Sequence, residues 1–128
     1  MADPKAYLLD THILLWWLNG DPRITSEREQ QLSSRDCLIS AASVWEVAIK
    51  HRLGKLPIAP EHLLDIAVKA GFRTLQVSCE HAAATALLPP HHQDPFDRLL
   101  LAQARLECLK LITVDADLLR YGEGVERL

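Results

Sequence analysis

The apolar residues of the chain fall into short runs that alternate with longer, helix-like segments. These runs predict strands over residues 6–9, 37–40, 73–77 and 110–114, with a short last strand over 125–128. The first has almost no polar alternation, which is typical of a parallel strand covered on both faces. The intervening segments predict helices over 11–19, 26–33, 44–53, 60–70, 78–88 and 95–108, and a helical turn over 115–121.

Several helix ends carry capping residues. Thr25 or Ser26 suits an N-cap, Gly54 suits a C-cap, and Asp94 followed by Pro95 is a favourable helix start. Strands that alternate with helices predict an α/β fold with a central parallel sheet flanked by helices on both faces. The length of 128 residues indicates one domain over 1–128.

Composition excludes several classes of protein. The 48% of hydrophobic and 24% of charged residues are ordinary for a globular protein. The three cysteines lie far apart without a CxxC pair, which argues against a disulfide framework or a zinc knuckle. The longest apolar stretch, residues 13–18, is too short to span a membrane, and the N-terminus lacks a secretory signal pattern. We therefore expect a cytoplasmic protein without a membrane partner.

A group of acidic residues is predicted to meet at one edge of the sheet. Asp10 and Asp115 directly follow strands, and parallel sheets place their sites beyond the carboxyl ends of the strands. Helices that start from the same edge carry three further acids, Glu46, Asp94 and Asp97. Clustered carboxylates repel one another unless a proton or a cation is present.

Divalent cations with a preference for oxygen ligands, Mg²⁺ or Mn²⁺, relieve this repulsion. Such an ion activates water and stabilises the charge of an attacked phosphate, so phosphodiester hydrolysis is the natural reaction class. The net charge of −3 argues against a nucleic-acid coat protein but is compatible with such an enzyme.

Each acid also has a structural alternative. Asp10 can cap the following helix, Asp97 can favour the helix dipole, and Glu46 can lie on a solvated face. For Asp94 the N-cap role is favoured over a metal role. Of the two remaining acids, Asp115 and Asp117, one is expected to hold metal or water and the other to act as a cap.

Four segments resemble the signature motifs of PIN domains, in the order and spacing of that family: YLLDTH at 7–12, SVWEV at 43–47, DPFDRL at 94–99 and LITVD at 111–115. Among PIN domains the chain is most similar to VapC-type toxins, the nuclease half of bacterial toxin–antitoxin pairs. The resemblance implies an Mg²⁺/Mn²⁺-dependent endoribonuclease. It places the catalytic, metal-binding acids at Asp10, Glu46, Asp97 and Asp115, and a supporting hydroxyl at Thr11.

RNA requires basic contacts, for which Arg98, Lys50 and Arg52 are the candidates. The alternatives are an ion pair for Arg98 and a solvated helix face for the other two. His91 and His92 either bind substrate or lie in the loop without a role, and the second interpretation is favoured.

The helix over 11–19 is apolar on all sides and carries Trp16 and Trp17, whose directions differ by about 100°. At least one indole is therefore expected to contact a partner. The resemblance implies a cognate VapB-type antitoxin and a homodimer.

Two other functions compete with the nuclease. A receiver-type signalling domain needs an acidic pair after the first strand and an acid after the third, and the sequence lacks both. A catalytically silent PIN-like module that binds RNA or protein remains the main alternative, although all four motif positions are acidic.

Overall fold

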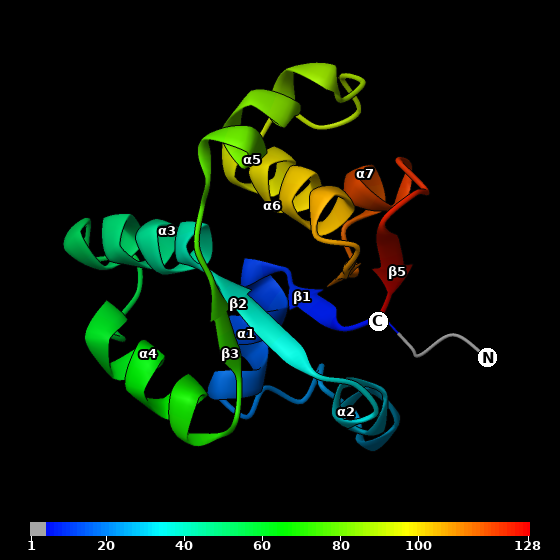
Figure 1. The fold of residues 1–128 in the computed structure, drawn as a ribbon. Helices are drawn as coiled ribbons and strands as arrows, with labels where there is room; N and C mark the ends of the chain where they lie inside the picture. Colours follow the sequence, from blue (N-terminus) through cyan, green and yellow to red (C-terminus); the bar gives the residue numbers. More distant parts are fainter. Residues whose placement is uncertain (1–4) are drawn as a thin grey trace.

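The chain forms a five-stranded parallel sheet with helices on both faces (Figure 1). The computed structural model describes residues 5–128. The strands are β1 (Tyr7–Leu9), β2 (Cys37–Ser40), β3 (Arg73–Leu75), β4 (Lys110–Thr113) and β5 (Val125–Arg127). The helices are α1 (Thr11–Leu18), α2 (Ser26–Ser33), α3 (Ala41–Arg52), α4 (Pro60–Lys69), α5 (Cys79–Ala84), α6 (Pro95–Leu106) and α7 (Ala116–Leu119), with a 3₁₀ turn η1 (Thr85–Leu87). The predicted α/β fold is confirmed.

Several element boundaries differ from those predicted by one to three residues, among them the following. Helix α3 begins at residue 41 because the Ser40 hydroxyl accepts the N–H of Ala42 and caps it. Strand β3 ends two residues early, where the Gln76 carbonyl accepts a side-chain N–H from Gln103. The predicted helix over 78–88 divides into α5 and η1.

The strand order β3-β2-β1-β4-β5 places β1 at the centre of the sheet. From β1 the chain builds outward through β2 to β3, and then returns to add β4 and β5 on the other side of β1. The order thus reverses between β1 and β4. A crevice forms at such a point beyond the carboxyl ends of the strands, where ligands bind in open α/β sheets.

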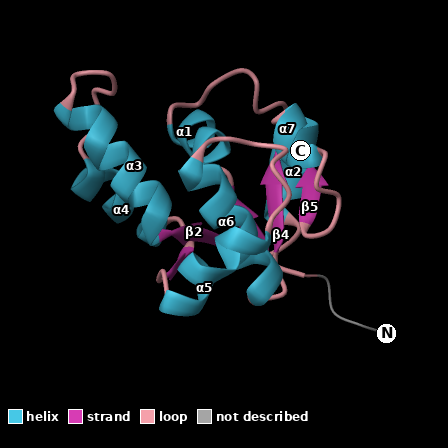
Figure 2. Ribbon diagram, turned by 90° about the horizontal axis from the view of Figure 1, so that it is seen from above, coloured by secondary structure: helices cyan, strands magenta, loops and turns pink. Residues whose placement is uncertain are grey.

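Alternation along the central strand divides the core between the two faces. Tyr7 and Leu9 face a cluster that includes side chains of α1, α2 and α4, whereas Leu8 faces one that includes side chains of α6 and α7. Figure 2 shows α6 beside β4, with α3 and α4 set to one side. The α3 helix contributes to both clusters, through Val47 and Ala42, and so lies at the boundary between the layers.

None of the helices in the part of the chain that the structure describes is long and apolar enough to cross a membrane. The three cysteines are free thiols, of which Cys37 is buried and Cys79 and Cys108 are exposed.

Candidate active site

Asp10 lies immediately after β1, at the edge of the sheet where the strand order reverses, and only 2% of it is exposed. Its Oδ1 accepts the N–H of His12 at 3.3 Å, which caps α1 as one sequence interpretation predicted. Its Oδ2 accepts the hydroxyl proton of Thr113, the last residue of β4, at 2.6 Å. The carboxylate therefore joins the two strands between which the sheet order reverses.

Asp97 lies in the first turn of α6 and is 6% exposed. The pKa of Asp97 is raised to about 7, mainly by burial and in addition by the negative charges of Asp10, Asp94 and Glu46, while His92 opposes the rise. These influences require the carboxylates to lie near one another. The predicted convergence of acids from β1, α3 and α6 is therefore present.

Glu46, at the middle of α3, is 5% exposed. Its Oε2 accepts from Lys50 Nζ at 3.0 Å, one helical turn away. Its Oε1 is buried and has no hydrogen-bond partner within residues 5–128. A buried carboxylate oxygen without a donor is costly, and a hard cation satisfies it. The donor set of Asp10, Glu46 and Asp97 thus fits a divalent metal ion.

Asp115 stands across from Asp97, with the ring of His92 between them. His92 Nε2 is 3.0 Å from Asp97 Oδ2 and 3.2 Å from Asp115 Oδ2. Asp115 Oδ1 caps α7 by accepting the N–H groups of Asp117 and Leu118. Burial raises the pKa of Asp115, but the hydrogen bonds from these N–H groups and from His92 outweigh it, and the net pKa is lowered.

Of the two acids that competed for this position, Asp115 combines the cap with the contact to the site, and Asp117 is exposed. One ligand atom each of His92, Asp115 and Asp117 lies within 4.8 Å of the others, a spacing that a metal ion can bridge.

The supporting residues take mainly structural positions. Asp94 is the N-cap of α6, as favoured from the sequence, and accepts the N–H groups of Phe96 and Asp97. The Thr11 hydroxyl is buried and donates to Ser43 Oγ at 2.9 Å. This bond leaves the Thr11 oxygen able to accept, so its role beside a metal-bound water stays a prediction.

Arg98 holds the loop before α6. Its guanidinium donates to the carbonyls of Thr85, Leu88, Pro89 and His92 and to the Tyr121 hydroxyl, over distances of 2.8–3.4 Å. Both terminal nitrogens of the guanidinium are occupied in this way. The contact of Arg98 with an RNA phosphate stays a prediction.

Among the other basic candidates, Lys50 lies at the site through its ion pair with Glu46, and Arg52 is exposed at the end of α3. His12 was not predicted. Its side chain is 54% exposed and its Nδ1 is 3.7 Å from Asp10 Oδ1. The hydrogen bond with Asp10 raises the pKa of His12, which favours the protonated ring beside the acids. The sequence signal that could have identified His12 is its position two residues after Asp10, the acid that follows the first strand.

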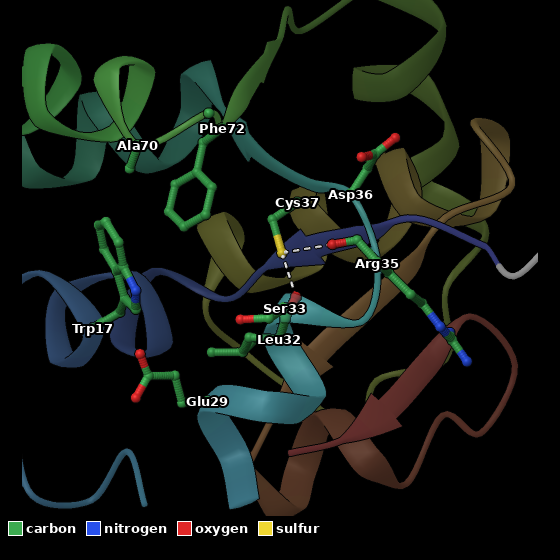
Figure 3. Close-up of a pocket in the computed structure, with 10 residues that line it drawn as sticks. Trp17, Glu29, Leu32, Ser33, Arg35, Asp36, Cys37, Ala70 and Phe72 are labelled. Atoms are coloured by element: carbon green, nitrogen blue, oxygen red, sulfur yellow. Dashed lines mark hydrogen bonds between the residues drawn. The ribbon is translucent and has the colours of Figure 1, made fainter. Parts of the chain in front are cut away.

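The two tryptophans differ in their surroundings. The Arg23 guanidinium covers Trp16, with its central carbon 4.2 Å from the ring centroid, and pairs with Asp21. Trp17 packs on Phe72 at 4.7 Å between centroids and lines a cavity of about 350 Å³ (Figure 3). Figure 3 shows Glu29 beside Trp17 on the same cavity, which lies at the start of β2.

A family model, described as the PIN domain, matches residues 7–124. The chain belongs to the PIN domain family. PIN domains are generally nucleases. A comparison with curated proteins gave no match.

Solved structures share the fold of this PIN domain. A toxin–antitoxin complex from Klebsiella pneumoniae is 23% identical with a TM-score of 0.68, over 94% of this chain and 96% of that one. VapBC2 from Rickettsia felis bound to a promoter DNA fragment is 18% identical with a TM-score of 0.71, over 95% and 98%. DNA-bound VapBC from Salmonella typhimurium is 19% identical with a TM-score of 0.68, over 97% and 98%.

Proposed function

We propose that this PIN domain is a metal-dependent endoribonuclease, the VapC-type toxin of a toxin–antitoxin pair. The observation that carries the proposal is the buried Oε1 of Glu46, which lacks a partner within residues 5–128 beside Asp10 and Asp97. A structural cluster of acids would satisfy each oxygen with a donor, whereas a metal site leaves oxygens free for the ion.

Asp10, Glu46 and Asp97 would hold Mg²⁺ or Mn²⁺, with Asp115 beyond His92. The ion, when bound, lowers the pKa of a coordinated water and stabilises negative charge on a phosphodiester. Lys50 borders these acids and would contact RNA phosphates, and Arg52 would extend this basic side along α3.

The likeness to chains of toxin–antitoxin complexes supports a VapB-type antitoxin as the partner of this cytoplasmic protein. The Trp17 cavity is the proposed contact, because a large aromatic ring in a concave site suits an interface anchor. A homodimer is supported by an apolar face on α3 and α6, formed by the exposed Trp45 and Ile49 and the half-buried Phe96 and Leu99.

The first experiment is cleavage of a mixed RNA pool by purified, antitoxin-free protein, with Mg²⁺ or Mn²⁺ and with EDTA. A DNA pool of the same sequences tests the preference for RNA. We expect metal-dependent RNA cleavage that is lost in Asp97→Asn and retained in Asp65→Asn, an exposed acid paired with Lys69 on α4. Metal binding without turnover by folded wild-type protein would favour the catalytically silent binding module.

A further inference from the structure

His92 projects from the loop before α6 into the space between two acids of the site. Its side chain is 13% exposed, and Nε2 lies 3.0 Å from Asp97 Oδ2 and 3.2 Å from Asp115 Oδ2. Two oxygens from different elements thus converge on one ring nitrogen. Such a point is also where a cation bridging the two carboxylates would lie, because metal ions bind oxygens of both neighbours at once.

The backbone determines which ring nitrogen of His92 carries the proton. The Asp94 N–H donates to Nδ1 at 3.0 Å, so Nδ1 must present its lone pair. In the neutral ring the proton then resides on Nε2, which donates to Asp115 Oδ2 and lies 3.0 Å from Asp97 Oδ2. A nitrogen that carries a proton has no lone pair for a metal ion.

The loop holds the ring in this position. The His92 N–H donates to the Tyr121 hydroxyl at 3.1 Å, and Arg98 Nη1 donates to the His92 carbonyl at 3.4 Å. Arg98 and Tyr121 are themselves joined at 3.3 Å. These contacts hold the backbone of His92, and the bonds at Nδ1 and Nε2 orient the ring toward the two carboxylates.

We propose that the Nε2–H of His92 occupies the place of a second cation, so that each site binds a single divalent ion on the side of Asp10 and Glu46. This inference rests on the proposed metal site but concerns its stoichiometry. His92 is thus a positioning residue, which keeps Asp97 and Asp115 together by a hydrogen bond in place of a bridging ion.

The competing arrangement makes His92, Asp115 and Asp117 a metal site of their own, since their ligand atoms lie within 4.8 Å. Two contacts oppose it. The Nδ1 acceptor bond leaves Nε2 protonated, and Asp115 Oδ1 is already engaged by two N–H groups of α7.

The test counts Mn²⁺ ions per chain in full-length, RNA-free protein, by titration calorimetry and by electron paramagnetic resonance. His92→Asn keeps an acceptor near the Nδ1 position for the Asp94 N–H but removes the donor at Nε2. His92→Gln keeps a donor near the Nε2 position. His91→Ala is the matched control, because His91 packs on Tyr121 with 4.9 Å between ring centroids and leaves the two carboxylate contacts of its neighbour intact.

We expect one ion in the wild type, in His92→Gln and in His91→Ala. We expect two ions in His92→Asn, with the spin-coupled spectrum of two Mn²⁺ ions about 4 Å apart. The affinity for the second ion should be about tenfold higher in His92→Asn than in the wild type. Two ions in the wild type, one ion in His92→Asn, or loss of binding in His92→Asn each overturn the inference. A wild type that binds one ion but cleaves no RNA defeats only the nuclease proposal, whereas one that binds none defeats the metal site as well.

Discussion

The environment of Asp97 destabilises its charged form in the folded, metal-free protein. Burial and the charges of three neighbouring acids raise its pKa to about 7, so the metal-free protein retains a proton that the unfolded chain releases near its ordinary pKa of 3.8. The electrostatic effect of His92 lowers the pKa of Asp97, but by less than burial and the three acids raise it. A site that binds a cation in place of the proton gains affinity from the same repulsion that destabilises the free protein.

This conflict predicts that Asp97→Asn stabilises the protein in EDTA. Because the folded pKa is raised, the stability present below pH 3.8 is lost as pH rises to about 7. Asparagine carries no charge and keeps an oxygen at the position of the carboxylate oxygen near His92 Nε2. We expect its free energy of unfolding at pH 8 to exceed that of the wild type by ~2–4 kcal/mol, with the gap closing toward pH 4.

Urea unfolding at a series of pH values measures this difference. The exposed Asp65→Asn variant should stay within about 0.5 kcal/mol of the wild type at every pH. Added Mn²⁺ should stabilise the wild type and reduce the difference in free energy of unfolding between it and Asp97→Asn. An Asp97→Asn protein less stable than the wild type at pH 8 in EDTA would refute the explanation by charge repulsion.

At the scale of elements, the segment from η1 to the start of α6 depends on Arg98. Its guanidinium bonds four carbonyls of this segment and the Tyr121 hydroxyl. Arg98→Ala should lower the free energy of unfolding by ~2–3 kcal/mol, because four carbonyls, three of them in part-buried hydrogen bonds, lose a charged donor. Arg98→Lys should recover little, since one ammonium lacks the fork that spans these acceptors.

Hydrogen exchange of the backbone amides over 85–94 is the direct measurement, with faster exchange expected in both variants. Arg52→Ala, at an exposed end of α3, serves as the comparison and should leave exchange there unchanged. Weaker RNA binding by Arg98→Ala with wild-type stability and exchange would restore the phosphate contact and contradict the structural role.

The helices that carry Glu46 and Asp97 are set against each other by a buried pair of polar side chains. The Ser40 hydroxyl, which caps α3, donates to Gln103 Oε1 of α6 at 2.6 Å. The amide of Gln103 in turn donates to the Gln76 carbonyl at the end of β3. One glutamine therefore fixes the sheet edge and both acid-bearing helices, and the sequence pattern gives no indication of it.

The positions of most strands and helices were predictable, because the apolar runs and the capping residues indicate the same elements. Apolar runs define the three central strands of the sheet, and the caps at Thr25 and Asp94 lie where their side-chain chemistry places them. The strand order was not predictable, because it depends on which elements pack together and not on any one segment. The early end of β3 has the same origin, since a distant side chain takes the Gln76 carbonyl.

For the site, the sequence identifies the acids but not the groups between them. Asp10 is recognisable because an apolar strand ends at it, and Asp97 because it follows a helix cap. His92 carries no periodic signal, and its importance depends on a loop conformation held by Arg98 and Tyr121. The Glu46–Lys50 ion pair has the spacing of one helical turn and was detectable from the sequence.

At the scale of the whole molecule, the acids and the Trp17 cavity lie at opposite edges of the sheet. The acids follow the carboxyl ends of β1 and β4, whereas the cavity includes residues 35–37 and 70–72, which lead into β2 and β3. Strands of this length span about 10–13 Å. A partner anchored at Trp17 therefore leaves the acids uncovered unless it continues along the surface for roughly five extended residues.

This separation makes antitoxin binding and catalysis independently testable. Trp17→Ala removes the ring that lines the cavity, whereas Trp16→Ala removes a ring already covered by Arg23. With purified cognate antitoxin, we expect Trp17→Ala to weaken binding by about 30-fold, the loss of a buried aromatic anchor worth ~2 kcal/mol, and Trp16→Ala to weaken it less. Calorimetric titration of folded variants measures both.

RNA cleavage by free Trp17→Ala should match the wild type, because the indole lies at the edge of the sheet away from the acids. The same variant should resist inhibition, needing proportionally more antitoxin for half-inhibition. Equal antitoxin affinity in Trp17→Ala and the wild type would exclude the cavity as the anchor. In that event the apolar face that contains Trp45 and Phe96 would be the next surface to test. It borders the first turn of α6, which carries Asp97, so a partner bound there would lie beside the acids.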